Sequence, residues 1–279
     1  MNEVGRHAPK RTVSAVKVAA AQWAVSDRSW EHNLAVLTSL AQSAADQGAG
    51  LIVAPEAAML DFGAQDNELA AQPLDGPWVE GLTALAASTG LTVIAGMFEL
   101  VPGEGRCFNT VTAVDGGGIR GAYRKIHLFD ALGWRESDRL LPGDGGTLVL
   151  AVDELTVGVM TCYDVRFPEL ARVLVDAGAT ALAVPAAWVA GHLKRTQWLT
   201  LLRARAIEST AYVIGAAQSP PRYAGASTVI DPFGEVLVEL GDEDGSVAVA
   251  EAAAECVVEV RAKVPSLANR RYSVVPGSP

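Results

Sequence analysis

A carboxylate, a lysine and a cysteine have the residue types that nucleophilic attack on a carbonyl carbon requires. Glu56 follows the apolar run Leu51–Ala54, and Cys162 follows the predicted strand Thr156–Thr161. Ligand sites in open α/β sheets gather at the carboxyl ends of strands. A free thiol is mostly protonated at neutral pH, so Cys162 would need a base such as Glu56 to attack. Lys125 would stabilise the negative charge that then develops on the carbonyl oxygen.

Each of these three residues also has an ordinary structural explanation when it is considered alone. Glu56 could be an acidic residue that a helix N-terminus favours. Cys162 could be an inert buried thiol, although polar residues follow it directly. Lys125 could discourage aggregation at an edge strand. Strand alternation places Lys125 on the same face as Tyr123 and His127.

Composition narrows the class of protein. The chain has 279 residues, of which 50% are hydrophobic, and its net charge is −10. That charge argues against a nucleic-acid or anionic-membrane partner. The three cysteines lie far apart and the four histidines show no paired spacing, so we expect no disulfide and no metal. The longest apolar stretch, 181–191, is too short to span a membrane, and lone thiols favour a cytoplasmic location.

Predicted helices and strands alternate along the chain, which favours an α/β fold. We expect a flexible tail over residues 1–14 and one domain over residues 15–279. Strands are predicted at 16–22, 51–54, 91–98, 110–114, 156–161, 181–184 and 212–216, with a hairpin over 227–240. Helices are predicted at 30–47, 77–88, 168–177 and 197–209.

An internal similarity indicates two related halves. The segment Gly48–Glu56 parallels Gly178–Ala186 at a constant offset of 130 residues. Both consist of a glycine that ends a helix, an apolar strand and a proline. Chance similarity between two such units is the alternative. If the repeat is real, one half carries Glu56 where the other carries Ala186.

Taken together, the segments around the three candidate residues resemble the nitrilase superfamily of carbon–nitrogen hydrolases. The segments are Ala54–Glu56, Tyr123–Leu128 and Thr161–Leu170, and the resemblance extends to 204–208 and 225–235. Glutamate, lysine, cysteine is the catalytic order in that family. The resemblance covers the chain from Val16 to about Leu240. It implies a four-layer α-β-β-α sandwich with two pseudo-symmetric halves, and a homodimer or larger homo-oligomer.

The resemblance also implies a role for each residue. Cys162 would be the nucleophile, Glu56 the base, and Lys125 the oxyanion stabiliser together with the backbone N–H of Tyr163. Glu136 matches a second glutamate that helps to position Lys125 and the substrate. A plain surface glutamate is the alternative for Glu136. This chemistry needs no cofactor.

Within the superfamily, the segments around Lys125 and Cys162 look most like the Nit branch. Its members hydrolyse ω-amides of 2-oxo acids, such as 2-oxoglutaramate, or the related deaminated glutathione. Both substrates are anionic, so a basic residue is expected in the pocket, and Arg166 is a candidate. A structural ion pair with Asp164 or Glu169 is the other interpretation of Arg166. Trp188 is a candidate pocket wall, although core packing is the commoner role of tryptophan.

The sequence departs from the family pattern at two positions that bear on the substrate pocket. Gln197 precedes Trp198 where many relatives have histidine, and Ser209 follows Glu208 where many have asparagine. Three hypotheses therefore remain. The first is an ω-amidase acting on a small amide. The second is another carbon–nitrogen hydrolase, such as a nitrilase, a carbamoylase, an aliphatic amidase or a deaminated glutathione amidase. The third is a non-catalytic binding protein.

Overall fold

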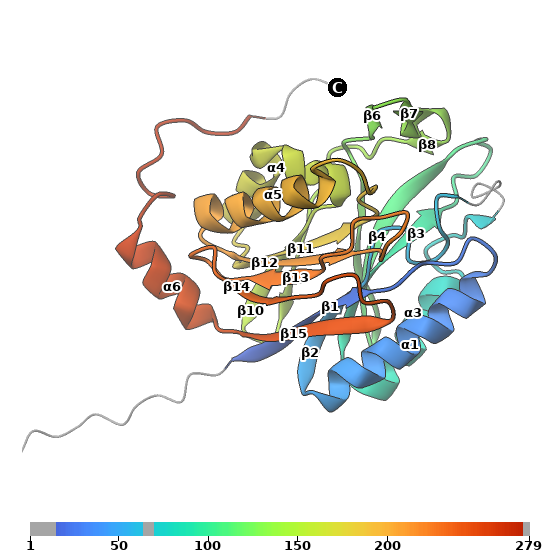
Figure 1. Ribbon diagram of the computed structural model, residues 1–279, viewed down its shortest axis with the longest axis horizontal. Helices are drawn as coiled ribbons and strands as arrows, with labels where there is room; N and C mark the ends of the chain where they lie inside the picture. Colours follow the sequence, from blue (N-terminus) through green and yellow to red (C-terminus); the bar gives the residue numbers. More distant parts are fainter. Residues whose placement is uncertain (1–14, 64–69, 276–279) are drawn as a thin grey trace, which may run out of the picture.

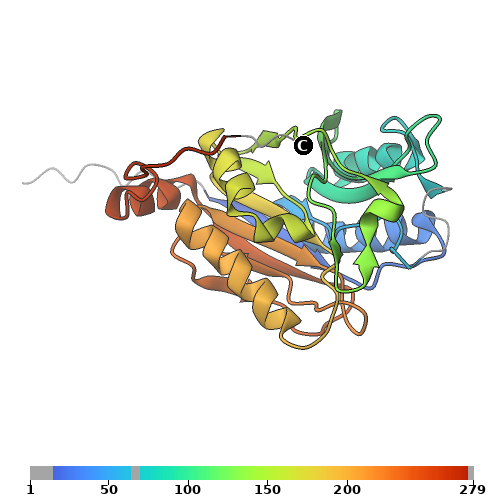
Figure 2. The ribbon, with the colours of Figure 1, turned by 90° about the horizontal axis from the view of Figure 1, so that it is seen from above.

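The computed structural model of the protein describes residues 15–63 and 70–275, so the predicted tail over 1–14 lies outside the described residues. The chain folds into two sheets that pack face to face, with a layer of helices on each outer side (Figure 1). Figure 2 shows helices α4 and α5 on one side of the sheets and α1 and α3 on the other. This is the predicted α-β-β-α sandwich.

The first sheet has the strand order β15-β1-β2-β3-β4-β5, with β8 paired to β4. Strands β1, β2 and β3 are parallel, and the helices α1 and α3 connect them; β4, β5 and β15 join the sheet antiparallel. The bounds are β1 Val16–Gln22, α1 Trp30–Asp46, β2 Ala49–Val53, α3 Pro77–Thr89, β3 Thr92–Glu99, β4 Cys107–Asp115, β5 Gly118–Arg124, β8 Leu140–Leu141 and β15 Ser246–Ala252.

The second sheet has the order β14-β13-β12-β11-β10-β9. Strands β10, β11 and β12 are parallel and are connected by α4 and α5, while β9, β13 and β14 join antiparallel. The bounds are β9 Leu148–Val152, β10 Leu155–Val159, α4 Pro168–Asp176, β11 Ala181–Ala186, α5 Lys194–Ser209, β12 Tyr212–Ala217, β13 Thr228–Ile230 and β14 Val236–Glu239.

The two sheets repeat one topology, because β1 to β5 correspond in order and direction to β10 to β14. The similar segments of the sequence fall on corresponding strands, β2 and β11. Two related halves are therefore seen in the structure as well as in the sequence.

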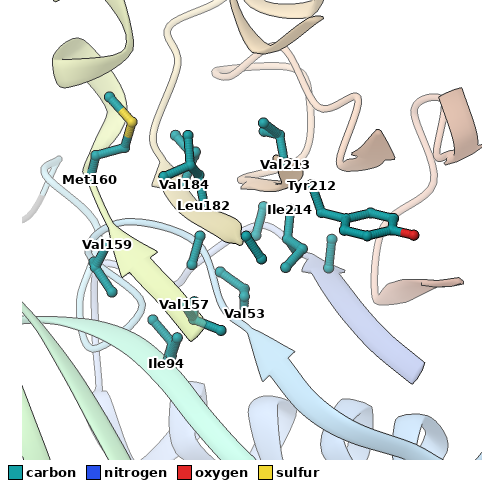
Figure 3. Close-up of a cluster of buried hydrophobic side chains, with 14 of the residues drawn as sticks. Val53, Ile94, Val157, Val159, Met160, Leu182, Val184, Tyr212, Val213 and Ile214 are labelled. Atoms are coloured by element: carbon teal, nitrogen blue, oxygen red, sulfur yellow. The ribbon is translucent and has the colours of Figure 1, made fainter. Parts of the chain in front are cut away.

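Side-chain alternation along the strands builds the layers. In β2, Leu51 and Val53 enter the cluster between the sheets, whereas Ile52 enters the cluster beneath α1 and α3. Figure 3 shows the cluster between the sheets, in which Val53 and Ile94 of the first sheet lie near Val157 of the second. This interior fixes the strands whose ends carry the candidate residues.

Short elements complete the fold. A small hairpin and two 3-10 turns lie between the main strands, and a last helix follows β15. They are β6 Asp130–Ala131, β7 Trp134–Arg135, η1 Glu136–Asp138, η2 Cys162–Arg166 and α6 Ala254–Lys263. Among the described residues, no helix is both long enough and apolar enough to cross a membrane.

Several element boundaries differ from those predicted by one to three residues, and two of these differences concern the segments that hold Cys162 and Lys194. Strand β10 ends at Val159, and Met160 and Thr161 lead into the 3-10 turn that begins at Cys162. Helix α5 begins at Lys194, three residues before the predicted start. Leu193 precedes it in a left-handed conformation with φ 58° and no side-chain cap, so no capping residue marked this start in the sequence.

Candidate active site

Glu56 lies just past the end of β2, and three donors hold its carboxylate. Oε1 accepts hydrogen bonds from Lys125 Nζ and Asn109 Nδ2, both at 2.8 Å. Oε2 accepts one from the backbone N–H of Ala187 at 2.8 Å. The backbone oxygen of Glu56 accepts from Gln218 Nε2 at 3.0 Å. Glu56 is buried, and its partners come from β4, from the segment after β5 and from the second sheet.

Lys125 follows β5 directly and lies between two carboxylates. Its side chain is 0% exposed, and Nζ is 2.8 Å from Glu56 Oε1 and 2.9 Å from Glu136 Oε2. Burial alone would lower the pKa of Lys125, but the charges of Glu136 and Glu56 outweigh it and raise that pKa well above its usual range. Lys125 is therefore a permanent cation at the centre of the site.

Glu136 begins the 3-10 turn η1 and is buried rather than exposed on the surface. Both of its oxygens accept from Lys125, and Oε2 also accepts from the backbone N–H of Phe129 at 2.9 Å. Burial raises the pKa of Glu136, and Lys125 opposes that rise. The structure thus brings Glu136 to Lys125, where the resemblance to the superfamily places it.

Cys162 begins the turn after β10 in a backbone conformation that is unusual for any residue other than glycine. Its φ is 47°, in the left-handed region that disfavours residues with a Cβ. The thiol is mostly covered by protein. Burial raises the pKa of Cys162 well above its usual range, and the nearby charge of Glu56 and a hydrogen bond to it add to the rise, while Lys125 opposes it. The thiol therefore stays protonated until a base removes its proton.

A buried aspartate ties the turn of Cys162 to the segment of Lys125. Asp164 accepts from the Thr161 backbone N–H at 2.8 Å and from the Tyr123 hydroxyl at 2.7 Å. Its other oxygen lies 2.7 Å from His127 Nδ1. Because Tyr123 and His127 flank Lys125 in the chain, this one carboxylate fixes the nucleophile turn and the lysine segment relative to each other.

A cavity of about 140 Å³ opens beside Cys162. Its volume is below the roughly 300 Å³ at the lower end of drug-sized pockets, so it suits a small molecule. Aromatic side chains form most of the wall, and the polar lining groups include Glu136, Lys194 and Arg222. The described lining residues are Phe62, Phe129, Trp134, Glu136, Cys162, Tyr163, Ala187, Trp188, Val189, Lys194, Arg222 and Tyr223. No group of three or more His, Cys, Asp or Glu side chains within residues 15–63 and 70–275 is arranged to hold a metal ion.

The family model for carbon-nitrogen hydrolases matches residues 17–262. The chain belongs to the carbon-nitrogen hydrolase family. It is 39% identical over 258 residues to the deaminated glutathione amidase of Escherichia coli O157:H7, covering 92% of this chain and 97% of that protein. It is 33% identical over 258 residues to the omega-amidase NIT2 of Xenopus tropicalis, a match that covers 87% of this chain and 90% of that protein.

A solved structure of a mutant amidase from Nesterenkonia sp. AN1 is similar in fold, with a TM-score of 0.78 and 25% identity over 93% of this chain and 95% of that one. In that structure the acetamide moiety of fluoroacetamide is covalently attached to the active-site cysteine. The protein described here is accordingly a nitrilase-superfamily hydrolase of the Nit/omega-amidase-like group that acts on carbon–nitrogen bonds of amides.

The predicted substrate-binding residues of this carbon-nitrogen hydrolase lie in different places. Tyr163 and Trp188 line the cavity, and Arg166 is not among the lining residues. Arg166 Nη2 donates to Gln197 Oε1 at 2.7 Å, and its guanidinium lies 5.0 Å from the centre of a Trp188 ring. Gln197, one of the two departures from the family pattern, therefore holds Arg166 against Trp188. Neither Asp164 nor Glu169 forms an ion pair with Arg166 within the described structure.

Among the residues that sequence reasoning missed, four have polar or charged side chains that contact Glu56 or line the cavity. Asn109 and Gln218 hold Glu56, and Lys194 and Arg222 line the cavity. Asn109 lies inside β4, and Gln218 follows β12 directly. A polar residue after a strand was the feature that singled out Glu56, and the same rule would have found Gln218.

Proposed function

We propose that this protein hydrolyses the terminal carboxamide of a small anionic amide, a 2-oxo acid ω-amide such as 2-oxoglutaramate, through a thioester at Cys162. The observation that carries the proposal is a chain of contacts: Cys162 lines a small cavity and hydrogen-bonds to Glu56, which in turn accepts from Lys125. The products would be ammonia and the carboxylate, and water would be the only other reactant.

Acylation follows from the contacts of the site. Glu56 takes the thiol proton as the sulfur of Cys162 attacks the amide carbon, which needs a base because burial keeps the thiol protonated. Negative charge develops on the carbonyl oxygen, where the ammonium group of Lys125 and the backbone N–H of Tyr163 stabilise it. Such a donor is worth about 10²- to 10³-fold in kcat. Glu56 then gives its proton to the nitrogen as the carbon–nitrogen bond breaks and ammonia leaves.

Deacylation uses the same residues. Glu56 removes a proton from a water molecule that attacks the thioester carbonyl, and the oxyanion is again held by Lys125. The tetrahedral intermediate collapses, the carbon–sulfur bond breaks, and the proton on Glu56 returns to the sulfur of Cys162. The fixed contacts from Asn109 and Ala187 keep the carboxylate of Glu56 in one place through both half-reactions.

Deaminated glutathione is the second candidate substrate, because 39% identity links this chain to an amidase with that name. Deaminated glutathione and 2-oxoglutaramate share the 2-oxoglutaryl acyl group and differ only in the amine that leaves. The acyl half of the mechanism is therefore the same for both. The cavity of about 140 Å³ favours the smaller amide as the fully enclosed substrate.

Ammonia release from 2-oxoglutaramate tests the proposal, with an aliphatic nitrile and an N-carbamoyl amino acid assayed for ammonia in parallel. Deaminated glutathione is assayed for release of its peptide amine, because its hydrolysis forms no ammonia. We expect release from 2-oxoglutaramate by the wild-type protein and none by Cys162→Ala. Cys256→Ala is the matched control, because it removes a thiol far from the cavity lining and should retain activity. Ammonia release that persists in Cys162→Ala would overturn the mechanism, and no release from 2-oxoglutaramate would overturn the substrate.

A further inference from the structure

The cavity beside Cys162 carries a cation without a carboxylate partner among the described residues. Lys194 lines the cavity and is half-buried. Its Nζ lies 4.6 Å from the centre of a Trp188 ring and 5.5 Å from the centre of the Phe129 ring. The faces of aromatic rings attract a cation but do not neutralise its charge. Lys194 therefore places at the cavity wall a basic group that no carboxylate of the described residues neutralises.

Arg222 and Arg195 differ from Lys194 because carboxylates already neutralise them, and Arg166, which has no carboxylate partner in the described structure, does not line the cavity. Arg222 also lines the cavity, but its Nη1 lies 2.6 Å from Asp61 Oδ1 and its side chain is 47% exposed. Arg195, the next residue of α5, pairs with Glu239 at 2.9 Å and Asp242 at 3.0 Å. Of Lys194, Arg195 and Arg222, only Lys194 has its charge available to a ligand.

The surroundings of Lys194 make a bound anion favourable. Helix α5 begins at Lys194 and has no acidic residue in its first turn, although a helix N-terminus favours negative charge. Burial lowers the pKa of Lys194, and the nearby charge of Arg166 lowers it further. A carboxylate bound at Nζ would oppose this lowering of the pKa, because an opposite charge at contact favours the protonated amine.

We propose that Lys194 binds the distal carboxylate of the substrate and so selects amides that carry a negative charge at the end opposite the scissile bond. The proposal rests on the proposed function, since it assigns the two ends of one substrate to Cys162 and Lys194. In this arrangement Trp188 and Phe129 form the apolar walls around the ammonium group. Arg166 is a positioning residue that packs on Trp188 rather than the group that contacts the carboxylate.

A matched pair of amides tests this assignment. 2-Oxoglutaramate and 4-oxopentanamide have the same chain, except that a methyl group replaces the carboxylate in the second. In Lys194→Met we expect KM for 2-oxoglutaramate to rise about 10- to 100-fold, as loss of a hydrogen bond to a charged group predicts, with kcat changed much less. The kinetics with 4-oxopentanamide should not change. Lys194→Arg should recover most of the affinity, and Arg195→Met is the control for loss of a nearby charge.

Binding to an inactive variant separates this proposal from the proposed function. Calorimetry with Cys162→Ala and with Cys162→Ala/Lys194→Met measures affinity for 2-oxoglutaramate without turnover. Hydrolysis by the wild-type protein together with an unchanged KM in Lys194→Met would overturn the role of Lys194 and leave the function intact. Binding that depends on Lys194 without any hydrolysis would overturn the function and leave the anion site intact. An equal loss for both amides would show a structural role and would also overturn the assignment.

Discussion

Replacing Lys125 by methionine removes the cation that separates two buried carboxylates. Nζ lies 2.8 Å from Glu56 and 2.9 Å from Glu136, and the lysine side chain is 0% exposed. Breaking a buried ion pair by removing one partner costs about 3–5 kcal/mol, because the remaining charge is left without compensation. Here two charges are left, so we expect Lys125→Met to lose at least about 3 kcal/mol of unfolding free energy in urea denaturation at pH 7.

The loss should depend on pH in a defined direction. Burial raises the pKa of Glu136, and Lys125 is the group that opposes the rise, so the pKa of Glu136 should rise further in Lys125→Met. When a carboxyl group has a higher pKa in the folded protein than its value of about 4.3 in the unfolded chain, it stabilises the fold fully below that unfolded pKa. This stabilisation is lost as the pH rises through the pKa of the group in the folded protein. The difference in stability between wild type and Lys125→Met should therefore shrink from pH 8 to pH 5.

A double variant separates stability from catalysis. Lys125→Met/Glu136→Gln removes one of the two unpaired charges and should recover part of the lost stability. Hydrolysis should stay at least about 10²-fold below wild type, because the oxyanion donor is still missing. The reasoning is wrong if Lys125→Met unfolds at the wild-type urea concentration, or if the double variant regains wild-type hydrolysis.

Three further outcomes follow from the contacts. Asp164→Ala leaves the buried donors of Thr161 and Tyr123 unpaired, so we expect a loss of about 3 kcal/mol in unfolding free energy. A loss under about 1 kcal/mol would contradict the role of Asp164 in joining the turn of Cys162 to the segment of Lys125. Burial raises the pKa of Cys162, so the rate at which this thiol is alkylated should still increase with pH at about pH 9, because alkylation requires the thiolate. Peptide mass spectrometry measures the rate, with Cys256 as the internal control, and a plateau below pH 8 would contradict the raised pKa. A Cβ on Gly96 would lie 2.6 Å from the backbone nitrogen of Ala57, the residue after Glu56, so Gly96→Ala should lower kcat and reduce the unfolding free energy by about 1–3 kcal/mol. Gly105→Ala is the control, because a Cβ there meets open space and should change neither quantity.

The periodic pattern of apolar residues was enough to predict most of the two sheets and their four covering helices. It did not reveal β9, β15 or α6. Strand β15 pairs with β1, from the opposite end of the domain, and three of its seven residues are alanines, so alternation is weak there. Helix α6 buries only Val257 and Val260, which is too few for a helical pattern to stand out.

The site was predictable where chemistry coincides with a strand end. Glu56 and Cys162 each follow an apolar run, and the structure brings them into contact, with Cys162 lining the cavity. Lys125 contacts both Glu56 and Glu136. Asn109 could not be found in this way, because its side chain reaches Glu56 from within a strand 53 residues later. Lys194 looked like an ordinary residue in a loop, since its position depends on a helix start that no capping residue marks.

The two halves of the fold also explain why the site has one base. Glu56 and Ala186 occupy equivalent places in the repeated segments, Glu56 just past the end of β2 and Ala186 at the end of β11, and the ends of these two strands meet at the site. The first half contributes the carboxylate, and the second contributes the backbone N–H of Ala187, which donates to that carboxylate. A second glutamate at position 186 would bring another negative charge into the same buried space, which Lys125 already shares with two carboxylates. The difference at this one repeated position therefore turns two similar strand ends into a base and the donor that holds it.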